Sequence, residues 1–152
     1  MIKRVAKGHA EVCSEWIYFS KFKSWMEQQD WEGKELDKDL LDFGSNIYSP
    51  EKCLFIDRKL NSLFRPFSSS INIRGTHPVG NRFKSIYKVD GKSIYIGTYD
   101  TEIEAHIAWQ ISMIFFLQHL SLDYEGKIRE AIRKRAFRII SDVKNNNITR
   151  AI

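Results

Sequence analysis

Two absences narrow the class of protein before any motif is considered. The 152-residue sequence has no run of roughly 18 apolar residues, so no transmembrane helix is expected. Its basic start, residues 1–8, lacks the apolar stretch of a secretory signal, which makes a cytoplasmic location the expectation. With 43% hydrophobic and 28% charged residues, the chain has the composition of one ordinary folded domain or two very small ones.

Cysteine is also scarce. Cys13 and Cys53 are the two cysteines of the chain, too few for a disulfide framework. A zinc site would need histidine ligands, and of the four histidines only His9 lies near a cysteine in the sequence. Buried free thiols are therefore the expectation.

The positive charge is unevenly spread. The formal net charge is +5, yet residues 1–66 carry 11 basic and 11 acidic side chains. Residues 71–100 carry five basic and two acidic, residues 101–120 only two acidic, and residues 121–152 eight basic and four acidic. The excess falls on two segments, as expected of a surface that faces phosphates, although an ordinary basic surface gives the same counts.

Hydrophobic spacing predicts short elements in the first half. Ser20 is expected to cap a short helix with Phe22, Trp25 and Met26 on one face. The other expected elements are extended pieces at 36–46 and 48–56, a brief helix at 57–65, and a serine-rich linker at 67–70.

The second half predicts a sheet followed by helices. Strands are expected at 73–76, 82–89 and 93–99, with Asp90-Gly91 as a hairpin turn. Alternation places Lys84, Ile86, Lys88, Ser93 and Tyr95 on one face, and Phe83, Ser85, Tyr87, Ile94 and Ile96 on the other.

Two helices are expected after this sheet. Thr101 and Glu104 form a capping box at the start of the first helix, from which Ala105, Ala108, Trp109 and Ser112 are expected to pack on the sheet. The apolar run 111–117 predicts burial on more than one side, or an interface. A basic amphipathic helix follows at 124–143, and the tail after it is expected to be loose.

The predicted fold class is α+β. It comprises a degenerate ββα-metal-like module at 1–66, a three-stranded antiparallel sheet packed on a helix at 71–120, and a basic helix with its tail at 121–152.

A sequence pattern in the sheet region resembles a known family. Arg74-Gly75-Thr76, Arg82-Phe83-Lys84, residues 95–105 and Ala108-Trp109 are similar to the plant ethylene-response-factor (Apetala-type) DNA-binding domain, a module related to those of phage and mobile-element endonucleases. The resemblance implies that the exposed sheet face lies in the major groove of DNA, with the helix behind it. The DNA-facing positions that it implies are Arg74, His77, Lys84, Lys88, Ser93 and Tyr95, with Arg82 beside them.

Departures from this family weaken the expectation of strict base reading. Ile86 stands where the plant domains have an acidic base-contacting residue, and Tyr95 replaces their tryptophan. The alternative is a small sheet-and-helix module that merely packs on a partner.

A second pattern covers residues 12–62. It consists of Val12-Cys13-Ser14-Glu15-Trp16, Phe19, Phe22, residues 33–39, Asn46, Tyr48-Ser49-Pro50-Glu51-Lys52-Cys53 and Asn61, and it resembles phage HNH-type homing endonucleases. The resemblance implies a ββα-metal finger that binds a Mg²⁺-class ion and cleaves phosphodiesters. It assigns catalytic positions to Asp37, Asp39 and Asn46, and metal positions to Asp39 and Asn61.

The histidine that serves as general base in that family is missing from the first strand, which reads Asp37-Lys38-Asp39. A carboxylate of ordinary pKa, near 4, is a weak base for water at neutral pH. The alternative is that the acidic pair caps a turn or forms ion pairs with Lys38 and Lys52, in a finger that only helps to bind DNA.

The leading hypothesis is therefore a double-stranded DNA-binding protein of phage type, acting in the cytoplasm of a host cell with weak or absent nuclease activity. A non-catalytic phage protein that binds and regulates a host protein through residues 111–143 is the alternative. A dimer built through the same helices is a third.

Overall fold

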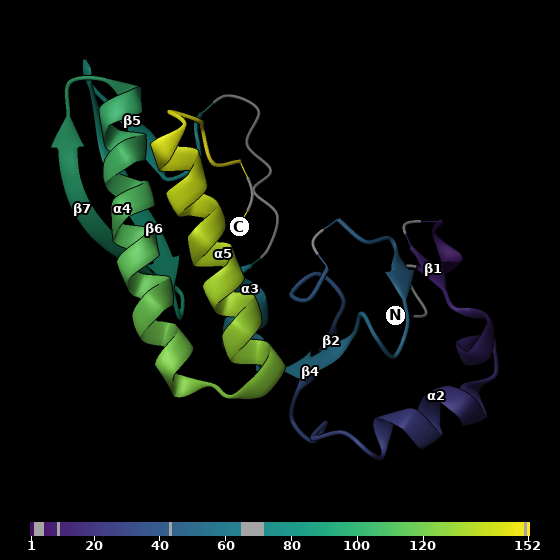
Figure 1. The fold of residues 1–152 in the computed structure, drawn as a ribbon. Coiled ribbons are helices and arrows are strands. Elements are labelled where there is room, and N and C mark those ends of the chain that lie inside the picture. The colour runs from purple at the N-terminus through teal and green to yellow at the C-terminus, as the bar shows by residue number, and fades with distance from the viewer. Residues whose placement is uncertain (2–4, 9, 43, 65–71, 151) are drawn as a thin grey trace. The chain divides into compact units, whose positions relative to one another are not determined.

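A computed structural model describes residues 1, 5–8, 10–42, 44–64, 72–150 and 152 of the chain. The fold is α+β, as predicted, and it divides into two compact units, Met1–Phe64 and Arg65–Ile152 (Figure 1). The predicted linker at 67–70 lies outside the described residues.

The first unit consists of short elements. In chain order they are β1 (Glu11–Val12), η1 (Ser14–Ile17), α2 (Phe19–Met26), β2 (Glu35–Asp37), β3 (Ile47–Tyr48), β4 (Leu54–Ile56) and α3 (Arg58–Leu63). Strand β1 pairs in parallel with β3, and β2 pairs antiparallel with β4. Because α3 directly follows β4, the unit contains a ββα order of elements.

Aromatic side chains hold this small unit together. The ring of buried Trp16 lies 5.1 Å from that of Phe22 and 4.6 Å from that of Trp25, measured between centroids. Ala10, Tyr48 and Cys53 complete the buried cluster around Trp16. Cys13 and Cys53 are both free thiols, but the expected burial is confirmed for Cys53 alone, since Cys13 is half-buried. Burial raises the pKa of Cys53 to about 11.

Two predictions for this unit are wrong in detail. Helix α2 begins at Phe19 with Tyr18 at its N-cap, so Ser20 lies inside the helix; the chain enters α2 directly from η1. The extended pieces at 36–46 and 48–56 are three short strands, because the chain turns immediately after β2. The helix from Asp57 is confirmed: the carboxylate of Asp57 accepts a hydrogen bond of 2.8 Å from the amide of Leu60.

The second unit contains an antiparallel sheet of order β5-β6-β7, formed by β5 (Thr76–Val79), β6 (Arg82–Val89) and β7 (Lys92–Tyr99). The predicted hairpin turn is confirmed, since Asp90 and Gly91 both have the positive φ angles of a type I′ turn, 52° and 74°. The predicted first strand at 73–76 is wrong: β5 begins at Thr76, because Gly75 turns the chain at φ +82°.

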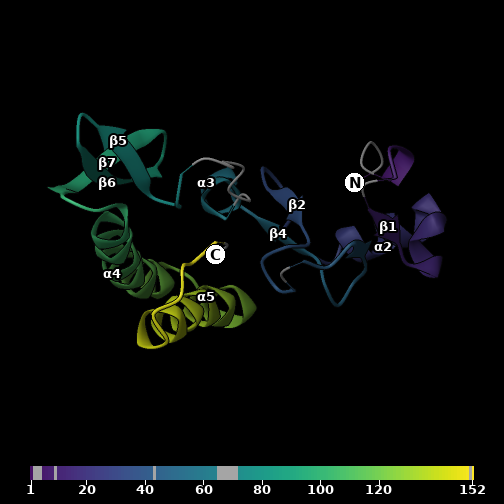
Figure 2. The same cartoon turned by 90° about the horizontal axis from the view of Figure 1, so that it is seen from above.

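Helix α4 (Glu102–Leu120) is the middle layer of this unit, with the sheet on one side and α5 (Gly126–Lys144) on the other (Figure 2). Its capping box, Thr101 with Glu104, is confirmed. Burial on two sides, predicted from the apolar run 111–117, is confirmed: Tyr87 of β6 contacts Phe116, and Met113 and Leu117 are buried. None of the helices among the described residues is long and apolar enough to cross a membrane.

The expectation of a loose C-terminal tail is wrong. Thr149 and Ile152 are buried, with 0% and 1% of their surfaces exposed. Gln110 of α4 donates hydrogen bonds of 2.9 Å to the carbonyl of Asn147 and to the Thr149 hydroxyl, which itself donates to Asp142 of α5. Polar side chains on the inner face of α4 therefore fix the tail, a role that the apolar pattern does not reveal.

His106 joins this tail to the start of the sheet. Its Nδ1 donates to the carbonyl of Arg74 at 2.8 Å, because a carbonyl can only accept, and its Nε2 accepts the amide of Thr149 at 3.0 Å. The second bond requires the neutral ring, because a protonated Nε2 has no lone pair with which to accept the Thr149 amide. Burial lowers the pKa of His106 below its ordinary 6.5, and the hydrogen bond to the Arg74 carbonyl and the nearby carboxylates of Asp142 and Glu102 only partly offset that effect.

The stability of the second unit is therefore expected to decrease in mild acid. The pKa of His106 is lower in the folded than in the unfolded chain, so its contribution is fully present above pH 6.5 and is lost as the pH falls through the folded value. A tenfold difference in the proton affinity of His106 between the folded and the unfolded chain corresponds to about 1.4 kcal/mol of stability. Urea unfolding measures the free energy of unfolding at neutral pH and at about pH 5. The wild type and His119→Gln, which lacks an exposed histidine, should both lose the stability that depends on His106 at the lower pH, whereas His106→Gln should not. A loss of equal size in all three proteins would contradict the assignment.

Candidate nucleic-acid interface

One face of the sheet is turned away from α4, and we refer to it as the outer face. Strand pairing aligns His77 with Lys84, Lys84 with Thr98, Ile86 with Tyr95, and Lys88 with Ser93. Together with Arg82, these side chains make up the outer face: His77, Arg82, Lys84, Ile86, Lys88, Ser93, Tyr95 and Thr98. Six of the seven predicted DNA-facing residues, all but Arg74, are thus brought together.

The opposite face of the sheet is closed by α4. Ser85 and Thr76, which pair across β5 and β6, are 0% and 1% exposed. On the outer face, by contrast, His77, Lys84, Lys88 and Ser93 are exposed, and Tyr95 exposes 61% of its surface. The alternation of β6 predicted from the sequence therefore separates an exposed face from a packed one.

The outer face is cationic. Lys84 and Lys88 stand four residues apart on β6, a separation of about 13 Å along a strand. Neither ammonium group has an ion-pair partner within the part of the chain that the structure describes. Arg82 is different, because its Nε lies 2.8 Å from a carboxylate oxygen of Asp100 and its Nη2 donates to the carbonyl of Thr98. Lys84 and Lys88 are therefore the uncompensated charges of the outer face.

Sequence alternation missed Thr98, because a β-bulge changes the phase of β7. Ser85 pairs with Gly97, whereas the next residue of β6, Ile86, pairs with Tyr95, which leaves Ile96 as the extra residue. Thr98 consequently shares the outer face with Tyr95, and their hydroxyl groups lie 2.9 Å apart. Gly97 was the available signal, since a glycine inside a strand often marks a bulge.

Arg74 lies apart from the other predicted DNA contacts. Its guanidinium carbon is 5.5 Å from the centroid of the Trp109 ring, and its Nη1 donates to the carbonyl of Arg150 at 3.4 Å. Burial lowers its pKa to about 10. In this position Arg74 links the segment before β5 to α4 and to the C-terminal tail.

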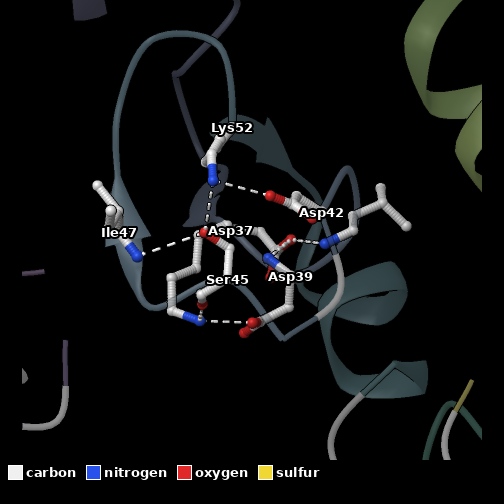
Figure 3. Close-up of polar contacts among 8 residues, drawn as sticks. Asp37, Asp39, Asp42, Ser45, Ile47 and Lys52 are labelled. Carbon is white, nitrogen blue, oxygen red and sulfur yellow. Dashed lines mark hydrogen bonds and ion pairs between the residues drawn. The ribbon is translucent and has the colours of Figure 1, made fainter. Parts of the chain in front are cut away.

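The predicted catalytic pair lies at the end of β2: Asp37 is the last residue of the strand and Asp39 lies in the loop that follows it (Figure 3). The Oδ2 atom of Asp37 accepts the amides of Asp39 at 2.9 Å and Leu40 at 2.6 Å, so this carboxylate caps the turn that ends β2. Burial raises the pKa of Asp37, and the neighbouring Asp39 raises it further, partly offset by the two amide hydrogen bonds.

Asp39 is engaged with a lysine. The Nζ atom of Lys38, a residue only 5% exposed, lies 2.5 Å from Oδ1 of Asp39 and 2.6 Å from the carbonyl oxygen of Ser45. Asp42, further along this loop, pairs at 2.9 Å with Lys52, which lies in the turn between β3 and β4 (Figure 3). The alternative interpretation, in which the acidic pair caps a turn and forms an ion pair with Lys38, therefore describes this loop. It was wrong about Lys52, whose partner is Asp42.

The two asparagines of the expected metal finger are placed differently. Asn46 is exposed, and its carbonyl accepts the amide of Glu11 at 2.7 Å. Asn61 of α3 donates from Nδ2 to a carboxylate oxygen of Glu35 on β2 at 2.6 Å, which ties helix to strand. Among the described residues, no three or more His, Cys, Asp or Glu side chains are grouped so that they could hold a metal ion.

Comparisons of the chain with protein-family models, with curated proteins and with solved structures found no match.

Proposed function

We propose that the chain is a double-stranded DNA-binding protein of phage or mobile-element type, which lies on the duplex through the outer face of its sheet. The observation that carries the proposal is the pair of uncompensated lysines, Lys84 and Lys88, on an exposed sheet face backed by a helix. A major groove about 12 Å wide admits such a ribbon, and ammonium groups on it neutralise phosphates.

Contact with the DNA backbone accounts for most of the proposed affinity. Lysines bind phosphates as point charges, whereas base reading relies on side chains such as arginine that make two parallel hydrogen bonds. Arg82 is the arginine of the outer face, and it is already bonded to Asp100 and Thr98. We therefore expect modest sequence preference, with His77, Ser93 and Tyr95 adding contacts that do not require one base.

Nuclease activity is expected to be weak or absent. The first strand has no histidine, Asp37 is used as a turn cap, and Asp39 is bound to Lys38. A Mg²⁺ ion would have to compete with Lys38 for Asp39, in a loop where the lysine already supplies the positive charge. The first unit then adds to DNA binding or positioning rather than to cleavage.

A titration and a cleavage assay test this proposal together. A labelled duplex of about 20 base pairs is titrated with the full chain at increasing NaCl concentration, and supercoiled plasmid is incubated with the chain and Mg²⁺ or Mn²⁺. Phosphate contacts by Lys84 and Lys88 predict that the logarithm of the affinity falls with the logarithm of salt at a slope of about −2 or steeper.

Two outcomes would contradict the proposal. A duplex affinity that does not change with salt would exclude binding through phosphates. Metal-dependent plasmid cleavage that Asp39→Ala abolishes would show that the loop after β2 is an active site, despite its lysine.

A further inference from the structure

The second unit has an apolar hollow where α4 passes into α5, on a part of the molecule that the DNA-binding proposal does not use. The hollow has a volume of about 480 Å³. We call it the helix groove. Its lining includes Gln118 of α4, Leu122 of η2 (Ser121–Asp123), and Arg133, Ala136, Phe137 and Ile140 of α5.

The groove exposes large apolar side chains. Leu122 and Phe137 expose 66% and 68% of their surfaces, while Ala136 beneath them is buried. A contiguous exposed apolar patch on a folded domain is typical of a site where another molecule binds. Along α4 the apolar surface continues at four-residue spacing through Phe115 and Ile111, which are 59% and 44% exposed.

The rim of the groove is held in place. Arg129 of α5 donates from Nε to the carbonyl of Tyr124 at 2.6 Å and to that of Ser121 at 3.2 Å. These bonds fix the turn that carries Leu122. An occupant would therefore meet a preformed surface and would not have to order it on binding.

The charge around the groove selects the occupant. Arg133 is the charged residue of its lining, and α5 also exposes Lys127, Lys134, Arg138 and Lys144. These cations outnumber the exposed carboxylates of the region, which are Asp123 beside Leu122, Glu125 at the N-cap of α5, and Glu130. A symmetric contact with a second copy would bring the same cations together. Nucleic acid would have to place phosphates against Leu122 and Phe137, which offer them no hydrogen bonds.

We infer that the helix groove binds an acidic amphipathic helix of another protein. Its apolar residues, spaced three and four apart, would lie over Leu122, Phe137 and Ile140, and its carboxylates would face Arg133 and Lys134. This inference does not rest on the DNA-binding proposal, because the groove and the outer face are formed by different residues.

The test uses the full chain and a designed fluorescent helix of about 18 residues. The helix carries leucine and phenylalanine at three- and four-residue spacing and glutamate on its other faces; a twin carries lysine in place of glutamate. Anisotropy should show saturable binding of the acidic helix and none of its basic twin. Affinity for the acidic helix should fall about tenfold or more in Leu122→Ser/Phe137→Ser and severalfold in Arg133→Glu.

A matched control separates this binding from general stickiness. Phe19→Ser removes a phenylalanine from the first unit that is about as exposed as Phe137, 65% against 68%, and should leave the affinity unchanged. Circular dichroism and the unfolding temperature should be the same in all variants, since the substituted side chains are exposed.

Several results would overturn the inference. Equal binding of the two twins would show that charge does not select the occupant, and wild-type affinity in the Leu122/Phe137 double variant would show that the groove is not the site. A concentration-dependent dimer that Phe137→Ser abolishes would assign the groove to a second copy. A loss of duplex affinity in Leu122→Ser/Phe137→Ser would assign it to DNA.

Discussion

Reversing the charge of Lys84 and Lys88 together, as Lys84→Glu/Lys88→Glu, is expected to weaken duplex DNA binding by well over tenfold. The two ammonium groups are the uncompensated charges of the outer face, and the substitution converts attraction to phosphates into repulsion at both positions. It also removes about two counterion-releasing contacts, so the salt slope should become shallower by about 2. Fluorescence anisotropy with the labelled duplex measures both effects.

The control for this double variant keeps the net charge equal. Lys134→Glu/Lys144→Glu makes the same change of charge on α5, which α4 separates from the sheet (Figure 2). Because both lysines are exposed on a different layer, duplex affinity should fall only slightly, through the long-range field. Equal losses in the two double variants would mean that only net charge matters, and no loss in the first would mean that the outer face does not contact DNA.

Gly75→Ala is expected to have the largest effect on stability, a loss of about 3 kcal/mol from the second unit. Two costs combine at this position. The backbone has φ +82°, where a side chain is strained, and an added Cβ would lie 2.1 Å from Cγ of Trp109. The indole cannot easily move, because it is 2% exposed, lies parallel to His106 and is covered by Arg74.

A comparison with Gly80→Ala separates the cost of the contact with Trp109 from the cost of a positive φ angle. Gly80 also has a positive φ, 56°, but no atom lies within 4 Å of the position of an added Cβ. This variant should lose only about 1 kcal/mol. Urea unfolding of the two variants measures the difference, and equal losses would show that the contact with Trp109 carries no cost.

Features set by neighbouring residues were predictable from the sequence. The capping box of Thr101 and Glu104 and the turn of Asp90-Gly91 each depend on the chemistry of a few consecutive residues. The faces of β6 followed from strict alternation, which no bulge interrupts on that strand. This is why most of the proposed DNA-binding residues were identified together.

Features set by residues far apart in the sequence were not predictable in the same way. The tail is fixed by His106 and Gln110, which lie 43 and 39 residues before Thr149. The start of β5 depends on how closely Gly75 approaches Trp109, and the position of Thr98 depends on a bulge defined by pairing with β6. These outcomes are decided by tertiary contacts, which composition and periodicity do not specify.

The loop after β2 shows how one pattern permits two interpretations. A carboxylate at the end of a strand suits a metal ion and also suits a turn, and the sequence alone left both open. The structure gives Asp37 two backbone amides and gives Asp39 a nearly buried lysine, so both carboxylates have structural partners. The proposal for this protein therefore depends on the sheet rather than on the loop.

A titration of the isotope-labelled full chain with a short duplex, followed by amide chemical shifts, tests the central claim most directly. Binding through the outer face predicts that the largest shifts occur on β5, β6 and β7, at His77, Lys84, Lys88, Ser93 and Tyr95, with small changes on α5. Saturable shifts confined to α5 or to the first unit, with the sheet unchanged, would contradict it.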